Sequence, residues 1–173
     1  PDHPPYKLAR VSALSWTLTA VTFAWPPFND ENTGVITLTA SALTGNITLT
    51  ASASLFVAGD VGSYFKISEV SASKYNQWTT GVAYTSGDIV YYLGNIYESG
   101  TTASAGTRPP IHTTGAESDG AVTWTFLHDG AGYAQITGYT SATLVNATVI
   151  KRLPTTSATT RWSEGAWSTR RGY

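Results

Sequence analysis

The sequence predicts an all-β fold, and three observations support the prediction. Apolar residues recur at every second position, which is the period of a strand with one buried face. Charged residues make up only 12% of the 173 residues, and Thr, Ser, Ala and Gly are abundant. Turn dipeptides such as Gly59-Asp60 divide the chain into short segments. We expect a β-sandwich or barrel-like host domain with a small inserted module made of a β-hairpin or three strands.

The clearest element is a hairpin between residues 36 and 52. The sequence Ile-Thr-Leu-Thr-Ala-Ser occurs twice, at 36–41 and at 47–52, so that apolar side chains alternate with hydroxyl side chains. The residues between the copies include Gly45-Asn46, a pair that tolerates the positive φ angles of tight turns. We therefore expect two antiparallel strands with one apolar face and one threonine face.

Further segments show strand patterns and are separated by turn residues. They span residues 16–23, 64–70, 88–93, 95–99, 122–127, 133–137 and 143–151. Pro26-Pro27 and Pro109-Pro110 mark loops, because proline has no N–H to donate to a sheet.

Changes in composition predict the domain organisation. Tryptophan and tyrosine cluster within residues 78–97, whereas Thr-rich and Val-rich strands lie on either side. Residues 64–70 and 133–139 resemble hairpin partners interrupted at their tip, where insertions are tolerated. The predicted units are a discontinuous host domain (1–75 plus 130–160), an inserted module (76–129) and a C-terminal arm (161–173).

Charge and composition exclude several classes of function. The formal net charge of −1 predicts no specific nucleic-acid binding, although five of the ten basic residues fall within 151–171. No run approaches the roughly 20 apolar residues of a membrane span, so no membrane insertion is expected. The chain has no cysteine, which excludes disulfides and thiolate metal sites. It also has no methionine, even at position 1, which suggests a processed chain or a fragment of a longer one.

No motif predicts a catalytic residue, a metal or a cofactor. The sequence has no Gly-x-Ser-x-Gly elbow and no phosphate-binding loop. A metal site formed by His112 and His128 with Asp119 or Asp129 is an alternative to ordinary hydrogen-bonded loop histidines. Glu117 with Asp119 is an alternative carboxylate pair for a hydrolase, but a hairpin turn in a polar loop explains Asp119-Gly120 more simply.

Aromatic residues form the most informative cluster. Two short strands around Leu93-Gly94-Asn95 would carry several rings, which form either a flat platform for sugars or the core of a small module. The candidate carbohydrate-binding residues are Trp78, Tyr84, Tyr91, Tyr92, Tyr97 and Trp124. The candidate assembly contacts lie in the C-terminal arm and are Trp162, Trp167, Arg170 and Arg171.

Residues 78–97 resemble a known family. The series Trp78, Tyr84-Thr-Ser-Gly-Asp, Tyr91 and Gly94-Asn-Ile-Tyr97 is similar to chitin-binding-type (family 5/12-like) carbohydrate modules of chitinases and phage tail proteins. The continuation over 106–124 resembles the variant common in phage tail proteins, and Ser-Gly-Thr-Thr at 99–102 stands where the chitinase version places exposed tryptophans.

The flanking segments resemble the middle of tail nozzle or tail tubular proteins of short-tailed phages. The segments that carry this resemblance are 2–8, 16–18, 48–52, 60–62, 132–138, 161–168 and 171–173. The resemblance implies a β-rich domain of a larger subunit that assembles as a homo-oligomeric ring at the tail end, without catalysis.

The expected function is therefore a non-enzymatic structural component of a bacteriophage tail, a nozzle, tubular or hub protein. It would lie on the outer surface of the virion, contact other tail subunits, and contact a host surface glycan weakly through the inserted module. The alternative is a dedicated carbohydrate-binding adhesin of a tail fibre or secreted protein, and a third class is a cell-wall hydrolase. An exposed aromatic row favours the adhesin, and a buried row favours assembly.

Overall fold

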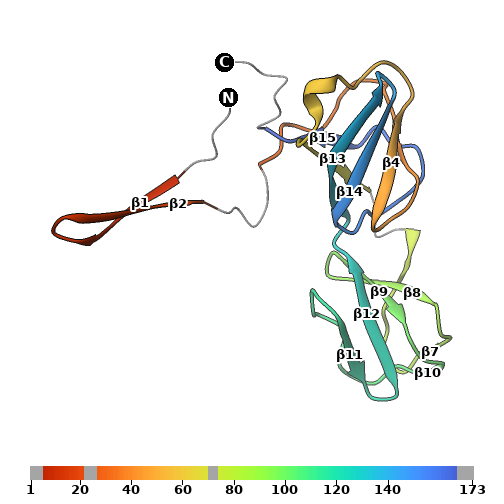
Figure 1. Cartoon of the computed structure of the whole chain (residues 1–173). Coiled ribbons are helices and arrows are strands. Elements are labelled where there is room, and N and C mark those ends of the chain that lie inside the picture. The colour runs from red at the N-terminus through yellow and green to blue at the C-terminus, as the bar shows by residue number, and fades with distance from the viewer. Residues whose placement is uncertain (1–5, 22–26, 70–73, 167–173) are drawn as a thin grey trace.

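The computed structural model describes residues 6–21, 27–69 and 74–166, and in these ranges the chain is all-β apart from short 3-10 segments, of which η1 spans Ala58–Asp60 (Figure 1). The predicted fold class is confirmed. The strands form a six-stranded sheet, a five-stranded sheet and two two-stranded ribbons. Within the described ranges, no helix is long and apolar enough to cross a membrane.

The six-stranded sheet forms the larger lobe, and all its strand pairs are antiparallel. Its order is β15 (Trp162–Glu164), β5 (Tyr64–Ser68), β13 (Ala131–Ser141), β14 (Leu144–Lys151), β4 (Asn46–Ala51) and β3 (Leu38–Ala40). One face of the sheet covers an apolar core to which every one of these strands contributes.

The predicted hairpin at residues 36–52 is confirmed as β3 and β4. Leu38 pairs with Ala51 and Ala40 with Leu49, and all four side chains are buried. The intervening threonines lie on the opposite face and are half-buried or exposed. Burying each leucine contributes about 1.5–3 kcal/mol, so the apolar face of this hairpin is a main source of stability for the lobe.

The two edges of the six-stranded sheet meet through residues 159–166, which we call the seam. Leu38 and Thr159 exchange two main-chain hydrogen bonds of 2.8 and 3.0 Å, while Trp162 pairs with Ile67 of β5. The indole N–H of Trp162 also donates to the carbonyl oxygen of Ile36 at 2.8 Å. The sheet is therefore curled and barrel-like, with β3 and β5 joined through the seam.

The seam corrects the prediction that a separate C-terminal arm begins at residue 161. Residues 162–164 are a strand of the main sheet, and Trp162 is only 7% exposed because its ring packs on Phe65 in the core. Trp162 is thus a core residue of this lobe and not a free assembly contact. Trp167, Arg170 and Arg171 lie outside the described residues.

Residues 76–129, which we call the aromatic module, form the smaller lobe (Figure 1). Its five-stranded sheet has the order β11 (Ala116–Asp119), β12 (Val122–His128), β9 (Asn95–Ser99), β8 (Ile89–Tyr92) and β6 (Asn76–Gln77). A ribbon of β7 (Ala83–Tyr84) and β10 (Ala103–Ser104) lies beside it. The module has its own core, which shares no residue with the core of the larger lobe. The module has more strands than predicted, because β6, β10 and β11 are short and lack an alternating apolar pattern.

The two ends of the aromatic module lie together on the larger lobe. The expected antiparallel pairing of residues 64–70 with 133–139 is present, with Tyr64–Ser68 opposite Ala131–Gln135. Beyond these strands, the Glu69 N–H donates to the Gly130 carbonyl oxygen at 2.9 Å. The chain therefore leaves and re-enters the sheet at adjacent positions.

The remaining ribbon is a hairpin of β1 (Tyr6–Ser12) and β2 (Ser15–Ala20) that extends away from both lobes in Figure 1. The predicted strand at 16–23 is present over residues 16–20, and the sequence pattern does not predict the strand at 6–12. Nearly every side chain of the hairpin is exposed.

We predict that replacing residues 76–129 by an Asn-Gly turn leaves a folded protein that melts cooperatively. The two cores are separate, and joining adjacent chain ends by a short turn relieves loop-closure entropy of about 0.6 kcal/mol per halving of loop length. Circular dichroism and calorimetry check the outcome. An unfolded deletion variant would show that the larger lobe depends on the module.

Candidate functional site

Five of the six predicted carbohydrate-binding aromatic residues lie in or against the core of the aromatic module, and the sixth, Tyr91, is half-buried on β8. Trp78, Tyr84, Tyr97 and Trp124 are each less than a tenth exposed. Tyr84 meets Trp124 edge-on with ring centroids 4.9 Å apart, and Trp78 meets Tyr92 in the same way at 5.6 Å. These contacts are the packing that a small module needs to form a core.

This placement leaves little aromatic surface for a sugar. Stacking on a sugar requires an open ring face, and only Tyr91 and Tyr92 of the six residues are partly exposed. Trp78 and Tyr97 cannot present open ring faces, because both rings are buried against other rings of the core.

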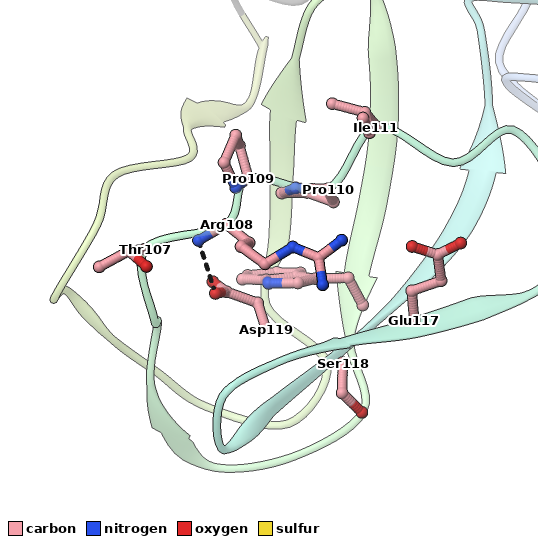
Figure 2. A pocket seen from close by; sticks show the side chains of 9 residues that line it. Thr107, Arg108, Pro109, Pro110, Ile111, Glu117, Ser118 and Asp119 are labelled. Atoms are coloured by element: carbon pink, nitrogen blue, oxygen red, sulfur yellow. Dashed lines mark hydrogen bonds between the residues drawn. The ribbon is translucent and has the colours of Figure 1, made fainter.

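A pocket of about 180 Å³ lies elsewhere on the aromatic module, between the loop at 107–111 and strand β11 (Figure 2). It is larger than a single-water site, since a water molecule occupies about 30 Å³ of liquid. Figure 2 shows the Arg108 side chain extending across the pocket between the side chains of Asp119 and Glu117. Ser118 points away from them, as expected for its neighbour position on a strand. The pocket is lined by Thr107, Arg108, Pro109, Pro110, Ile111, Glu117, Ser118, Asp119 and Trp124.

Asp119 holds the loop to the sheet. The Arg108 N–H donates to Asp119 Oδ1 at 3.0 Å, and the Asp119 side chain is almost fully buried. Gly106 makes this approach possible, because a Cβ at that position would collide with Asp119 Oδ1. Asp119 pairs with Val122 across a tight turn in which Gly120 has a φ of 63°.

The expectation that Glu117 and Asp119 occupy a polar loop is wrong. Both residues belong to β11, where Glu117 pairs with Trp124 of β12. The predicted turn at Asp119-Gly120 is present, but Asp119 itself is only 3% exposed. The sequence pattern did not reveal this burial, because the segment 116–119 is short and polar and has no apolar alternation.

Two buried polar atoms at this pocket have no hydrogen-bond partner among the described residues. They are Asp119 Oδ2, an acceptor, and Trp124 Nε1, whose N–H is a donor. An unpaired buried polar group costs about 1–3 kcal/mol, so the pair is a reason to look for a ligand. The loop at 107–111, which covers this place, was predicted only as a proline-marked loop and not as part of a site.

The two histidines considered as metal ligands lie in different surroundings. The His112 ring packs 5.0 Å from the Tyr97 ring, with its Nδ1 atom 3.9 Å from Glu117 Oε2. His128 is buried at the end of β12, where its Nδ1 accepts the Gly130 N–H at 3.1 Å. In the described part of the chain, no three His, Asp or Glu side chains are grouped to hold a metal ion.

His128 lies where the aromatic module joins the larger lobe, so its protonation affects the junction. Burial lowers the pKa of His128 below its ordinary value, and Arg152 and Lys151 lower it further while Glu69 and Asp129 raise it. Because its Nδ1 accepts a hydrogen bond from Gly130, the neutral ring fits the junction.

We predict that stability falls as the pH drops below about 6.5, since the unfolded histidine takes up a proton near that pH while the folded one resists it. The stabilisation by neutral His128 is fully present above the pKa of the unfolded histidine, and it is lost as the pH falls towards the lower pKa of the folded one. Melting temperatures measured from about pH 7.5 to 5.5 should fall more steeply for the natural chain than for His128→Asn. That variant keeps an acceptor for the Gly130 N–H and does not titrate. Equal slopes for the two proteins would exclude His128 as the source of the pH dependence of the melting temperature.

A scan against protein-family models and a search of curated proteins each return no match.

Proposed function

We propose that this chain is a non-enzymatic structural component of a bacteriophage tail, of the nozzle, tubular or hub type, which assembles with neighbouring subunits. The flanking segments that resemble tail nozzle and tail tubular proteins support the proposal. The structural observation that carries it is the exposed apolar face of the β1–β2 hairpin. Weak contact with a host glycan through the aromatic module and a place on the outer surface of the virion belong to the same proposal.

The hairpin has one apolar face, as its register requires. Leu8 pairs with Leu18, and Arg10 pairs with Trp16, so these four side chains lie on the same side of the ribbon. The Arg10 guanidinium lies 5.8 Å from the Trp16 ring centroid on that face. Leu8, Trp16 and Leu18 are each more than half exposed. The opposite face carries threonines, such as Thr17.

An exposed ribbon of this kind is an incomplete structure. An isolated two-stranded hairpin is at best marginally stable in water, and an apolar face on a projecting ribbon is a typical interaction surface. Burying Leu8 and Leu18 against a neighbour would contribute about 1.5–3 kcal/mol each. The unpaired main-chain edges of β1 and β2 also allow a strand of the neighbour to add to the ribbon.

Charge favours a second copy of the chain as the neighbour. Residues 6–20 carry two basic side chains, Lys7 and Arg10, and no acidic one. The aromatic module, by contrast, carries five acidic side chains and one basic one. The net positive charge of the hairpin thus complements the net negative charge that the aromatic module carries on every copy, which fits assembly of copies into a ring.

The burial of the aromatic row favours assembly over the alternative function, a dedicated carbohydrate-binding adhesin. An adhesin of the chitin-binding type would hold its rings open to solvent, and here four of the six rings are buried.

We predict that Leu18→Asp weakens self-association by at least about tenfold, because a buried charge replaces at least 1.4 kcal/mol of apolar contact. Thr17→Asp places the same charge on the opposite face of the same strand and should leave association unchanged. Sedimentation velocity over a range of protein concentrations measures both variants and the natural chain, and a melting curve confirms that each is folded.

A natural chain that stays monomeric at every concentration would contradict self-assembly through the hairpin. So would an equal effect of the two aspartate substitutions, since that would mean that the apolar face is not the contact.

A further inference from the structure

We call the pocket between the loop at 107–111 and β11 the Trp124 pocket. Its two unpartnered atoms differ in hydrogen-bonding character, and this difference restricts the chemical class of ligand that fits. Asp119 Oδ2 can only accept a hydrogen bond from a ligand, whereas Trp124 Nε1–H can only donate one. Their side chains are 3% and 0% exposed, so each is a buried group without a partner among the described residues.

A hydroxyl group satisfies both atoms, because it donates one hydrogen bond and accepts another. An anion would accept from Trp124 and pair with Arg108, but it would meet the carboxylates of Glu117 and Asp119 at the same pocket. A cation would pair with Asp119, but it would leave the Trp124 N–H without an acceptor and would be repelled by Arg108. The chemistry of the lining therefore favours a neutral, hydroxyl-bearing ligand.

The size and walls of the pocket limit the ligand further. A volume of about 180 Å³ is below the range of roughly 300–1,000 Å³ that accommodates drug-sized ligands, so it suits one small ring. Pro109, Pro110 and Ile111 supply apolar surface on one side, and the planar polar ends of Arg108 and Glu117 lie on the other. A sugar ring has this combination of C–H faces and hydroxyl edges.

The Arg108 side chain is free to rearrange at the pocket. Its side chain extends across the pocket in Figure 2, while the residue is exposed and its guanidinium forms none of the hydrogen bonds or ion pairs found among the described side chains. Because a long, exposed arginine moves at little cost, it can swing aside and then donate to ligand hydroxyls.

We propose that this pocket binds one ring of a neutral sugar, with a ring hydroxyl bridging Asp119 Oδ2 and Trp124 Nε1–H. The site differs from the aromatic row at residues 78–97, and it gives a location to the glycan contact in the proposed function. The sugar proposal rests only on the glycan contact within the proposed function. Assembly through the hairpin is measured in a separate experiment.

The experiment is an NMR titration of the ¹⁵N-labelled full chain with glucose, galactose and N-acetylglucosamine, each in turn. At least one sugar should shift the Trp124 indole N–H signal and the Arg108 amide signal saturably, with a dissociation constant on the order of 1 mM or weaker. Sodium acetate and methylammonium chloride serve as the anionic and cationic probes and should shift these signals less.

Asp119→Asn replaces the acceptor Oδ2 by a donor and keeps an acceptor for the Arg108 N–H, so sugar binding should weaken by at least about tenfold. Glu98→Gln removes the same charge from β9, away from the pocket lining, and should bind as the natural chain does. If Asp119→Asn does not fold, Glu117→Ala at the exposed rim takes its place and should also weaken binding.

Three outcomes would overturn the proposal. They are sugars that leave the Trp124 signal unmoved, an ion that shifts it as much as the sugars do, and a folded pocket variant that binds as tightly as Glu98→Gln. In each case the sedimentation results on the hairpin variants would still decide whether the chain self-associates.

Discussion

The main-chain pairing along the seam is the constraint on which the larger lobe depends. Leu38 and Thr159 exchange hydrogen bonds on one side, and Trp162 pairs with Ile67 on the other, so one segment satisfies both edges of the curled sheet. Without the seam, β3 and β5 would present unpaired edges to solvent. The buried indole of Trp162 fixes the segment by its hydrogen bond to Ile36 and its contact with Phe65.

A closed host sheet explains how an insertion is accommodated. Since β5 and β13 pair with each other and are held from both sides, the chain between them can extend without loss of a sheet contact. The aromatic module then needs a core of its own, and a small module obtains one from large rings. The same need buries the rings of Trp78 and Tyr97, while the Nε1 atom of Trp124 is left without a hydrogen-bond partner beside the pocket.

Local patterns predicted most of the fold, and contacts distant in sequence account for what was missed. The hairpin of β3 and β4 follows from alternation and a turn within 17 residues, so the sequence contains the whole signal. The place of Trp162 depends on a partner 126 residues earlier, which no local pattern reveals. At the candidate site, the rings were identified but their burial was not. The pocket was missed because Asp119 is buried only when the loop at 107–111 folds over β11.

Amide hydrogen exchange reports whether the seam closes the larger lobe. We expect the amides of Leu38 and Thr159 to exchange as slowly as those of Ala134 and Ala147 in the middle of the sheet, because all four open only when the lobe unfolds. Rapid exchange at Leu38 and Thr159 with continued protection at Ala134 and Ala147 would contradict it, since that pattern belongs to an open sheet with frayed edges.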